Sequence, residues 1–348
     1  MNFGIALFPD PGCATVVRRA EELGFRSAWF YDSQMLASDV FMCMALAAAS
    51  TERIRLATGV LIPTNRIAPV AASAFGTLNQ MAPGRVVFGV GTGFTGRNTM
   101  GQGAQPLADM AEYIRVVRAL MAGETVTWQS EGAGHDIRFL HPGHGFVNQD
   151  APVPVHISAF GPRGQALAVK AGDGWITFFG NEAGGIAQAA EMDRRIAEAG
   201  KDGGSYEKTA FTLGCVLGEG EAADSPRAMA QAGPIVAVGW HGVMERWEAL
   251  PDVARAAFAP MRALYETYSP ENARYLQLHT GHLLYVRDDE RSFITADAIK
   301  RQSFTGTREE LRDRVRAIKA AGYNEFVVQL VKGQEQAVED WAGVFDLV

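Results

Sequence analysis

The sequence predicts an α/β fold of the (β/α)8 barrel class, formed as a single domain over residues 1–348. Short apolar runs bounded by glycine and proline alternate with longer stretches in which apolar residues recur every three or four positions. The alternation continues along most of the chain. Repeated units of this kind form parallel strands with right-handed crossovers, and such units close into a ring more naturally than they form an open sheet.

The first half of the chain contains four strand–helix units. We expect strands at 5–8, 27–31, 54–61 and 86–90, and helices at 14–23, 39–49, 71–81 and 107–121. Each strand segment is a short apolar run, as is typical of a buried parallel strand. Three of the helices end beside Gly24, Pro83-Gly84 or Gly123, which are residues that commonly terminate helices.

The second half completes the ring but is interrupted. We expect strands at 154–158, 174–178, 211–217 and 325–330, and helices at 163–171, 186–199 and 335–344. Residues 123–149 are rich in glycine and histidine and alternate weakly, which predicts a hairpin excursion between the fourth helix and the fifth strand. Residues 222–301 predict an insertion or lid between the seventh and eighth strands, helical at 228–236 and 246–268.

Composition argues against several classes of function. Lys+Arg total 32 and Asp+Glu 39, so the net charge of −7 argues against a nucleic-acid partner. The well-separated Cys13, Cys43 and Cys215 argue against a disulfide framework and favour a reducing, cytoplasmic location. Residues 1–8 lack the basic start of a signal peptide, and the longest apolar run, 41–49, is too short to span a membrane.

The expected strand ends are rich in glycines and hydroxyls and poor in carboxylates and histidines. The segments 91–97 and 158–164 are examples. Hydrolysis or metal chemistry requires converging acids or histidines at these positions, so we expect no metal ligands there. Glycines allow backbone N–H groups to approach a flat or phosphorylated ligand, which favours a bound organic cofactor. We interpret the glycine pattern at 89–96 as a loop that lines the cofactor. The two alternative interpretations are a dinucleotide-binding fingerprint and a tight turn without a ligand.

Six stretches together carry a family resemblance. Spread in order over most of the chain, they are AEELGF (20–25), WFYDSQML (29–36), STERIRLATGV (50–60), PGRVVFGVGTG (83–93), AGDGW (171–175) and FTGTREEL (304–311). The chain resembles the bacterial luciferase-like flavin-dependent oxidoreductases, and within them the methylenetetrahydromethanopterin reductase-like branch. These stretches are specific for the superfamily and much less specific for the substrate.

The resemblance implies a TIM barrel that holds reduced FMN or the deazaflavin coenzyme F420 at its carboxyl end. In that family a non-proline cis peptide often follows the third strand and presses against the cofactor ring, and the matching bond here is Gly59–Val60. The family's phosphate contacts match Thr92, Gly93, Ser158, Ala159 and Gly161. Arg163 is placed to add positive charge there, with a solvated arginine at a helix start as the alternative.

Three residues are candidates for catalysis. Asp32 ends the second strand and is expected to bond the cofactor edge or the substrate, with a helix cap as the alternative. Many F420-using relatives carry an Asp-His pair at this point, whereas this chain has Asp32-Ser33. His279 and His282 are candidate proton donors in the substrate pocket, with lid packing as the alternative. A metal site is not expected at this pair, because no third ligand is close in sequence.

The function that the resemblance implies first is monooxygenation of a small organic substrate by reduced FMN and O₂, with a separate flavin reductase supplying the FMN. The alternative on the same barrel is F420-dependent hydride transfer. A non-catalytic flavin-binding protein is a further alternative, and a hydrolase is disfavoured by the missing carboxylates. Family members are commonly dimers, so a homodimer is expected by analogy.

Overall fold

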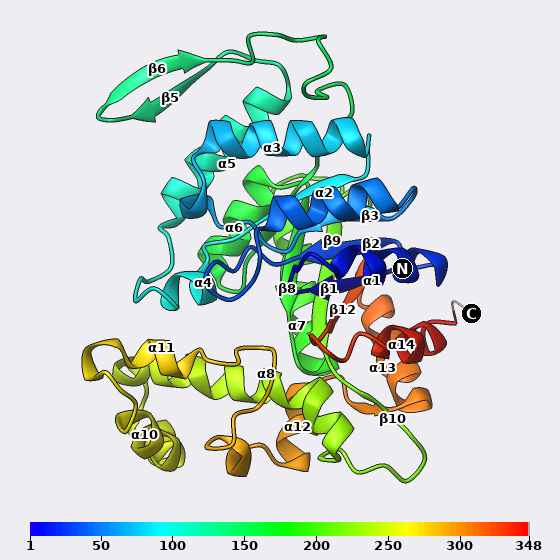
Figure 1. The fold of residues 1–348 in the computed structure, drawn as a ribbon, viewed down its shortest axis with the longest axis vertical. Coiled ribbons are helices and arrows are strands. Elements are labelled where there is room, and N and C mark those ends of the chain that lie inside the picture. Colours follow the sequence, from blue (N-terminus) through cyan, green and yellow to red (C-terminus); the bar gives the residue numbers. More distant parts are fainter. Residues whose placement is uncertain (347–348) are drawn as a thin grey trace.

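Eight parallel strands form a closed barrel in the computed structural model, which describes residues 1–346 (Figure 1). Their order around the ring is β1-β12-β9-β8-β7-β4-β3-β2, which confirms the predicted fold class. The strands are β1 (Asn2–Leu7), β2 (Ser27–Phe30), β3 (Arg55–Thr58), β4 (Val86–Val90), β7 (Val155–Ser158), β8 (Gly174–Phe178), β9 (Glu207–Leu213) and β12 (Glu325–Leu330). All eight overlap the expected strand segments.

Helices surround the barrel. They are α1 (Cys13–Glu22), α2 (Val40–Ser50), α3 (Ala68–Met81), α5 (Leu107–Met121), α6 (Pro162–Ala171), α7 (Glu182–Glu198), α13 (Arg308–Ala320) and α14 (Ala337–Val344). Two helices were not expected from the sequence. One is α13, although it begins with a capping box formed by Thr307 and Glu310. The other is the short α4 (Phe94–Asn98) after β4.

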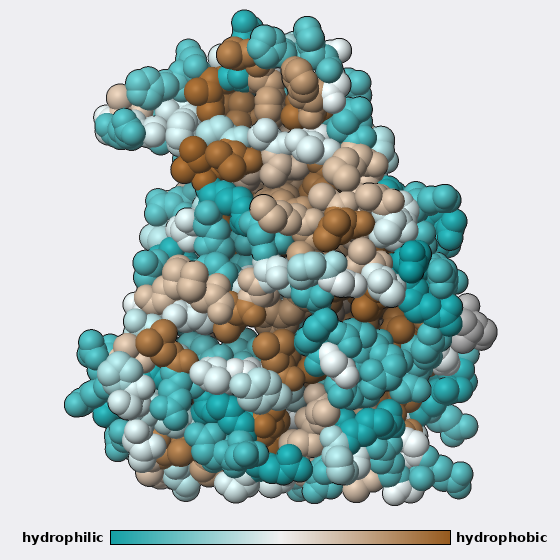
Figure 2. Space-filling model, viewed as in Figure 1, coloured by the Kyte–Doolittle hydropathy of each residue, from teal (hydrophilic) through white to brown (hydrophobic). Residues whose placement is uncertain are grey.

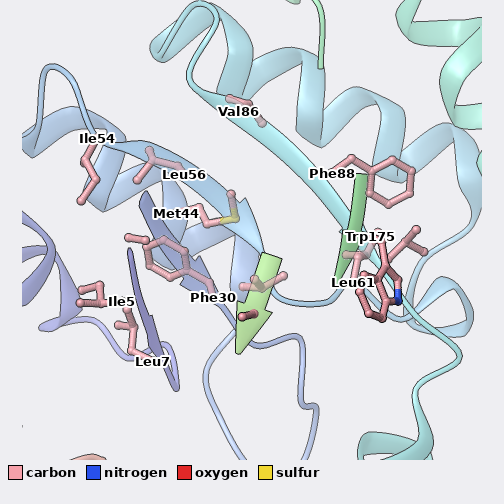
Figure 3. Packing of buried hydrophobic residues seen from close by; sticks show 14 of the residues in the cluster. Ile5, Leu7, Phe30, Met44, Ile54, Leu56, Leu61, Val86, Phe88 and Trp175 are labelled. Carbon is pink, nitrogen blue, oxygen red and sulfur yellow. The ribbon is translucent and has the colours of Figure 1, made fainter. Parts of the chain in front are cut away.

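Each strand directs alternate side chains to two different cores. Ile5, Leu7 and Phe30 point outward into the layer between strands and helices, where Phe30 lies near Met44 of α2 (Figure 3). Trp29, on the opposite face of its strand from Phe30, belongs to a second cluster with Phe211 and Ile176. This alternation follows from the two-residue period of a strand, and it means that the barrel interior is packed with side chains.

A hairpin lies between α5 and β7. Strands β5 (Val126–Ser130) and β6 (Ala133–Ile137) pair antiparallel and project beyond α3 and α5, at the top of Figure 1. His135, His141 and His144 lie in or just after this hairpin and are exposed.

The larger insertion forms a lobe at one side of the barrel (bottom of Figure 1). A parallel pair, β10 (Val216–Leu217) with β11 (Gly306–Thr307), joins its two ends. Its helices are α8 (Pro226–Glu245), α9 (Asp252–Ala257), α10 (Ala259–Glu266), α11 (Arg274–Leu278) and α12 (Ala296–Gln302), with short 3₁₀ turns at Trp247–Ala249, Glu271–Ala273 and Arg291–Phe293. Trp240, Leu278 and Ile299 belong to a core cluster separate from the two barrel clusters.

Two expectations about this region are wrong in detail. The strand expected at 211–217 is two strands, because the chain turns out of the barrel at Gly214, where a Cβ atom would lie 1.9 Å from the carbonyl oxygen of Phe304. The helix expected at 246–268 is broken, because Pro251 and Pro260 cannot continue a helix from its interior. Among residues 1–346, the structure contains no helix long and apolar enough to cross a membrane.

Candidate active site

A cavity of about 870 Å³ opens at the carboxyl ends of the barrel strands. On one side it is lined by the residues that follow β2, β3, β4 and β7, and on the other by α8 and the turn after α11. Its volume suits an organic cofactor together with a small substrate. All eight residues predicted to bind the cofactor line it: Gly59, Val60, Thr92, Gly93, Ser158, Ala159, Gly161 and Arg163.

The segment after β3 forms the wall of the cavity next to the barrel core. The Gly59–Val60 peptide is cis, as the resemblance implies. A Cβ atom on Gly91 would lie 2.7 Å from Cγ2 of Val60, and one on Gly59 would lie 3.0 Å from Cβ of Trp29. Glycine at both positions therefore allows Val60 to sit between the ends of β3 and β4, facing the cavity.

The β7–α6 connection provides a site suited to an anion. Gly161 is the N-cap of α6, and the first N–H groups of a helix have no partner within the helix. A Cβ atom on Gly161 would have no neighbour within 4 Å, so the space in front of the helix start is open. Arg163 is exposed and lines the cavity there. A phosphate group placed at this point meets unpaired N–H groups and a guanidinium.

Asp32 lines the cavity, but its carboxylate is already engaged. Oδ2 accepts hydrogen bonds from the Ile62 backbone N–H at 3.0 Å and from the Asn65 amide at 3.1 Å. Oδ1 accepts one from Arg66 at 2.9 Å. Asp32 is 5% exposed and does not cap a helix. These contacts fasten the loop that follows Gly59–Val60, which favours a positioning role over the predicted contact with cofactor or substrate.

His279 and His282 come together in a turn rather than on one helical face. His279 is the C-cap of α11, and Gly281 has a φ of 76°, so the helix does not continue through the pair. Their Nδ1 atoms lie 3.4 Å apart. His282 lines the cavity, whereas His279 lies behind it, with Nε2 2.8 Å from Oε1 of Glu245. Burial holds the pKa of His282 well below its usual range, so this imidazole is neutral at neutral pH.

His241 joins this pair from α8, and no sequence motif singles it out. Its Nε2 lies 2.8 Å from Oε1 of Glu290, which also forms an ion pair with Arg287. Burial lowers the pKa of His241 to about 3 and raises that of Glu290 to about 7. No short-range motif connects His241 with His279, because the two residues belong to different helices of the lobe.

Comparison with known proteins agrees with this architecture. A family model described as luciferase-like monooxygenase matches residues 13–325. The F420-dependent glucose-6-phosphate dehydrogenase of Kineococcus radiotolerans is 33% identical over 171 residues, which are 45% of this chain and 49% of that protein. The 5,10-methylenetetrahydromethanopterin reductase of Methanolobus tindarius is 35% identical over 179 residues, 50% of this chain and 53% of its own length. The chain thus spans about half the length of the curated relatives that it matches.

A solved structure shows the same fold over the full chain. The type II Baeyer–Villiger monooxygenase that oxygenates in the 3,6-diketocamphane system of Pseudomonas putida, solved in complex with FMN, superposes with a TM-score of 0.63. The match covers 100% of this chain and 96% of that one at 14% identity. At this identity the likeness concerns the fold alone.

Proposed function

The chain belongs to the luciferase-like monooxygenase family, and from this premise we propose that it transfers hydride between coenzyme F420 and a small organic substrate. The observation that carries the proposal is the imidazole of His282 on the cavity wall. Hydride delivery to a carbonyl carbon places negative charge on the attached oxygen, and a hydrogen-bond donor beside that oxygen stabilises the charge. The similarity to an F420-dependent dehydrogenase supports the same reaction class.

The cavity fits such a cofactor on two structural features. Glycines at 59 and 91 leave room for Val60 to present an apolar surface to a planar ring. The start of α6, with Gly161 and Arg163, suits the phosphate. When bound, F420 would donate or accept hydride at its ring. The roles of the chain would be to orient that ring, to exclude water and to hold a proton at the substrate oxygen.

His282 would hold that proton on Nε2. Its Nδ1 faces Nδ1 of His279, and the two nitrogens of an imidazole point in nearly opposite directions, so Nε2 is directed away from His279. In a neutral imidazole one nitrogen carries the proton. His279 and Glu245 stand behind the ring and restrict its orientation.

Monooxygenation with reduced FMN and O₂ is the second candidate. It is favoured by Ser33, which stands where many F420-using relatives carry a histidine. The same cavity accommodates FMN, and a separate reductase would then supply reduced FMN. This order reverses the one that the sequence resemblance implied, because the curated relatives at 33–35% identity are an F420-dependent dehydrogenase and a methanopterin reductase.

Anaerobic titration of the purified chain with F420 and with FMN, in both redox states, tests the proposal. We expect F420 to bind more tightly and its absorbance to change when a suitable alcohol or carbonyl compound is added without O₂. The variant His282→Ala should lose this turnover and still bind F420, whereas His144→Ala, in the exposed loop, should behave like the wild type. Tight binding of reduced FMN alone, with O₂-dependent product formation, would overturn the proposal.

A homodimer is also part of the proposal. Apolar residues gather over α2 and α3 on the face shown in Figure 2. Met42 and Leu46 of α2 are 73% and 46% exposed, and Val70 of α3 is 50% exposed. Neighbouring exposed apolar side chains on two adjacent helices are typical of a surface that a second copy covers.

A further inference from the structure

Three buried histidines meet in the lobe beside the cavity. His241 comes from α8, and His279 and His282 come from the turn that ends α11. All three are 2–3% exposed. One ring nitrogen of each lies within 4.8 Å of one ring nitrogen of both others. Three imidazoles that converge in this way offer three nitrogen ligands to one cation.

The surroundings assign an inner and an outer nitrogen to each ring. Nε2 of His241 is hydrogen-bonded to Glu290, and Nε2 of His279 is in contact with Glu245, although not in line for a hydrogen bond. Nδ1 of His241 has no partner in the described part of the chain, and Nδ1 of His279 faces only Nδ1 of His282. An unpartnered polar atom in a buried position is unfavourable unless a ligand occupies the space in front of it.

The geometry points to a metal site for a divalent transition-metal ion of the Zn²⁺ class, ligated by Nδ1 of His241, His279 and His282. Two nitrogens bonded to one tetrahedral Zn²⁺ lie about 3.3 Å apart, because each Zn–N bond is about 2.0–2.1 Å long. The Nδ1 atoms of His279 and His282 already lie 3.4 Å apart. Glu290 and Glu245 occupy the positions of the carboxylates that commonly orient metal-bound histidines from behind.

Such a site has a consequence for the cavity. Three protein ligands leave one position of a tetrahedral ion for water or another small ligand. A metal on Nδ1 of His282 also requires the ring proton to be on Nε2, the nitrogen directed away from the cluster. The ion would thus connect α8 to the turn after α11 and lock the orientation of a cavity-lining ring. This inference concerns metal binding and holds whichever cofactor the barrel uses.

The experiment uses the full chain, stripped with a chelator and then titrated with Zn²⁺ against a competing chromophoric chelator. We expect one Zn²⁺ per chain. The variants His241→Ala, His279→Ala and His282→Ala should each weaken binding by about 100-fold or more, and the milder Glu290→Gln by about 10- to 100-fold. His144→Ala, which changes an exposed histidine, should leave the affinity unchanged.

Co²⁺ provides a second readout that does not depend on variants. Substituted protein should show the intense visible absorption of tetrahedral Co²⁺, and excess Zn²⁺ should abolish it. Zn²⁺ should also raise the midpoint of thermal unfolding of the wild-type chain. The inference is overturned if the stripped wild-type protein binds no stoichiometric Zn²⁺, or if His241→Ala and His144→Ala bind it with equal affinity. In either case the three histidines would be a hydrogen-bonded cluster only.

Discussion

Replacement of Asp32 by Asn tests whether the Asp32 carboxylate positions the neighbouring loop or takes part in catalysis. The substitution keeps the shape of the side chain and removes its charge. One amide oxygen can still accept from the Ile62 N–H and the Asn65 amide, but the new NH₂ group then faces the Arg66 guanidinium, donor against donor. Losing the hydrogen bond between the buried Asp32 carboxylate and the partly buried Arg66 guanidinium should lower the free energy of unfolding by about 1.5–3 kcal/mol.

The loop held by Asp32 directly follows Gly59–Val60, so the same change should reach the cofactor. If the lost interaction makes the free energy of cofactor binding about 1.4 kcal/mol less favourable, the affinity for the cofactor falls about tenfold. Because we infer that Asp32 exchanges no proton in the reaction, the pH dependence of kcat should keep its shape. Urea denaturation, cofactor titration and a pH–rate profile measure these three quantities.

Asp39→Asn is the matched control. Asp39 pairs with the same Arg66, but it caps α2 and makes no hydrogen bond to Ile62 or Asn65, which Asp32 holds. Its side chain is 39% exposed, so the ion pair contributes at most about 1 kcal/mol, and Asn caps a helix as well as Asp. The reasoning is refuted if Asp32→Asn leaves stability and cofactor affinity unchanged but alters the pH–rate profile, since that outcome identifies a catalytic carboxylate.

Three further predictions concern other parts of the structure. Gly161→Asp should weaken binding of a phosphorylated cofactor at least tenfold relative to Gly161→Ala, because both side chains enter open space and only Asp adds negative charge. Equal affinities of the two variants in a fluorescence titration would show that the phosphate does not bind at this position. Burial lowers the pKa of His156 to about 4, so between about pH 6.5 and 4 the unfolded chain binds a proton that the folded chain does not. The free energy of unfolding should therefore fall by up to about 3 kcal/mol as the pH drops through that window. Denaturation at several pH values should show a smaller fall in the variant His156→Gln. Met42→Lys with Leu46→Lys should shift the protein from dimer to monomer in light scattering, and a wild type that is already monomeric would contradict the proposed dimer.

Local sequence patterns were sufficient for the barrel. A run such as 86–90 is apolar throughout because both faces of a strand in a parallel barrel are buried, and this property is visible without any long-range contact. Gly59–Val60 and Gly91 lie in the family stretches, Gly161 matches one of the family's phosphate contacts, and all of them line the cavity. Where residues that are neighbours in sequence are also neighbours in space, the sequence pattern is sufficient to predict the structure.

The lobe shows where local pattern stops being informative. Its proline-broken helices contact one another through residues far apart in the chain, so neither the packing of α8 against its neighbours nor the separate core follows from periodicity. The Asp32 carboxylate could be placed at a strand end but not beside Arg66, because that contact depends on how the loop after β3 folds back.

His241 is the clearest case. In sequence it is one histidine on an apolar helix, and the pair at 279 and 282 lacks a third ligand nearby. Chain folding brings one ring nitrogen of each histidine within 4.8 Å of the others, because α8 packs beside the turn that ends α11. Strand and turn patterns depend on interactions a few residues long, whereas a three-histidine cluster depends on how two distant segments pack, and that information is absent from any short window of the chain.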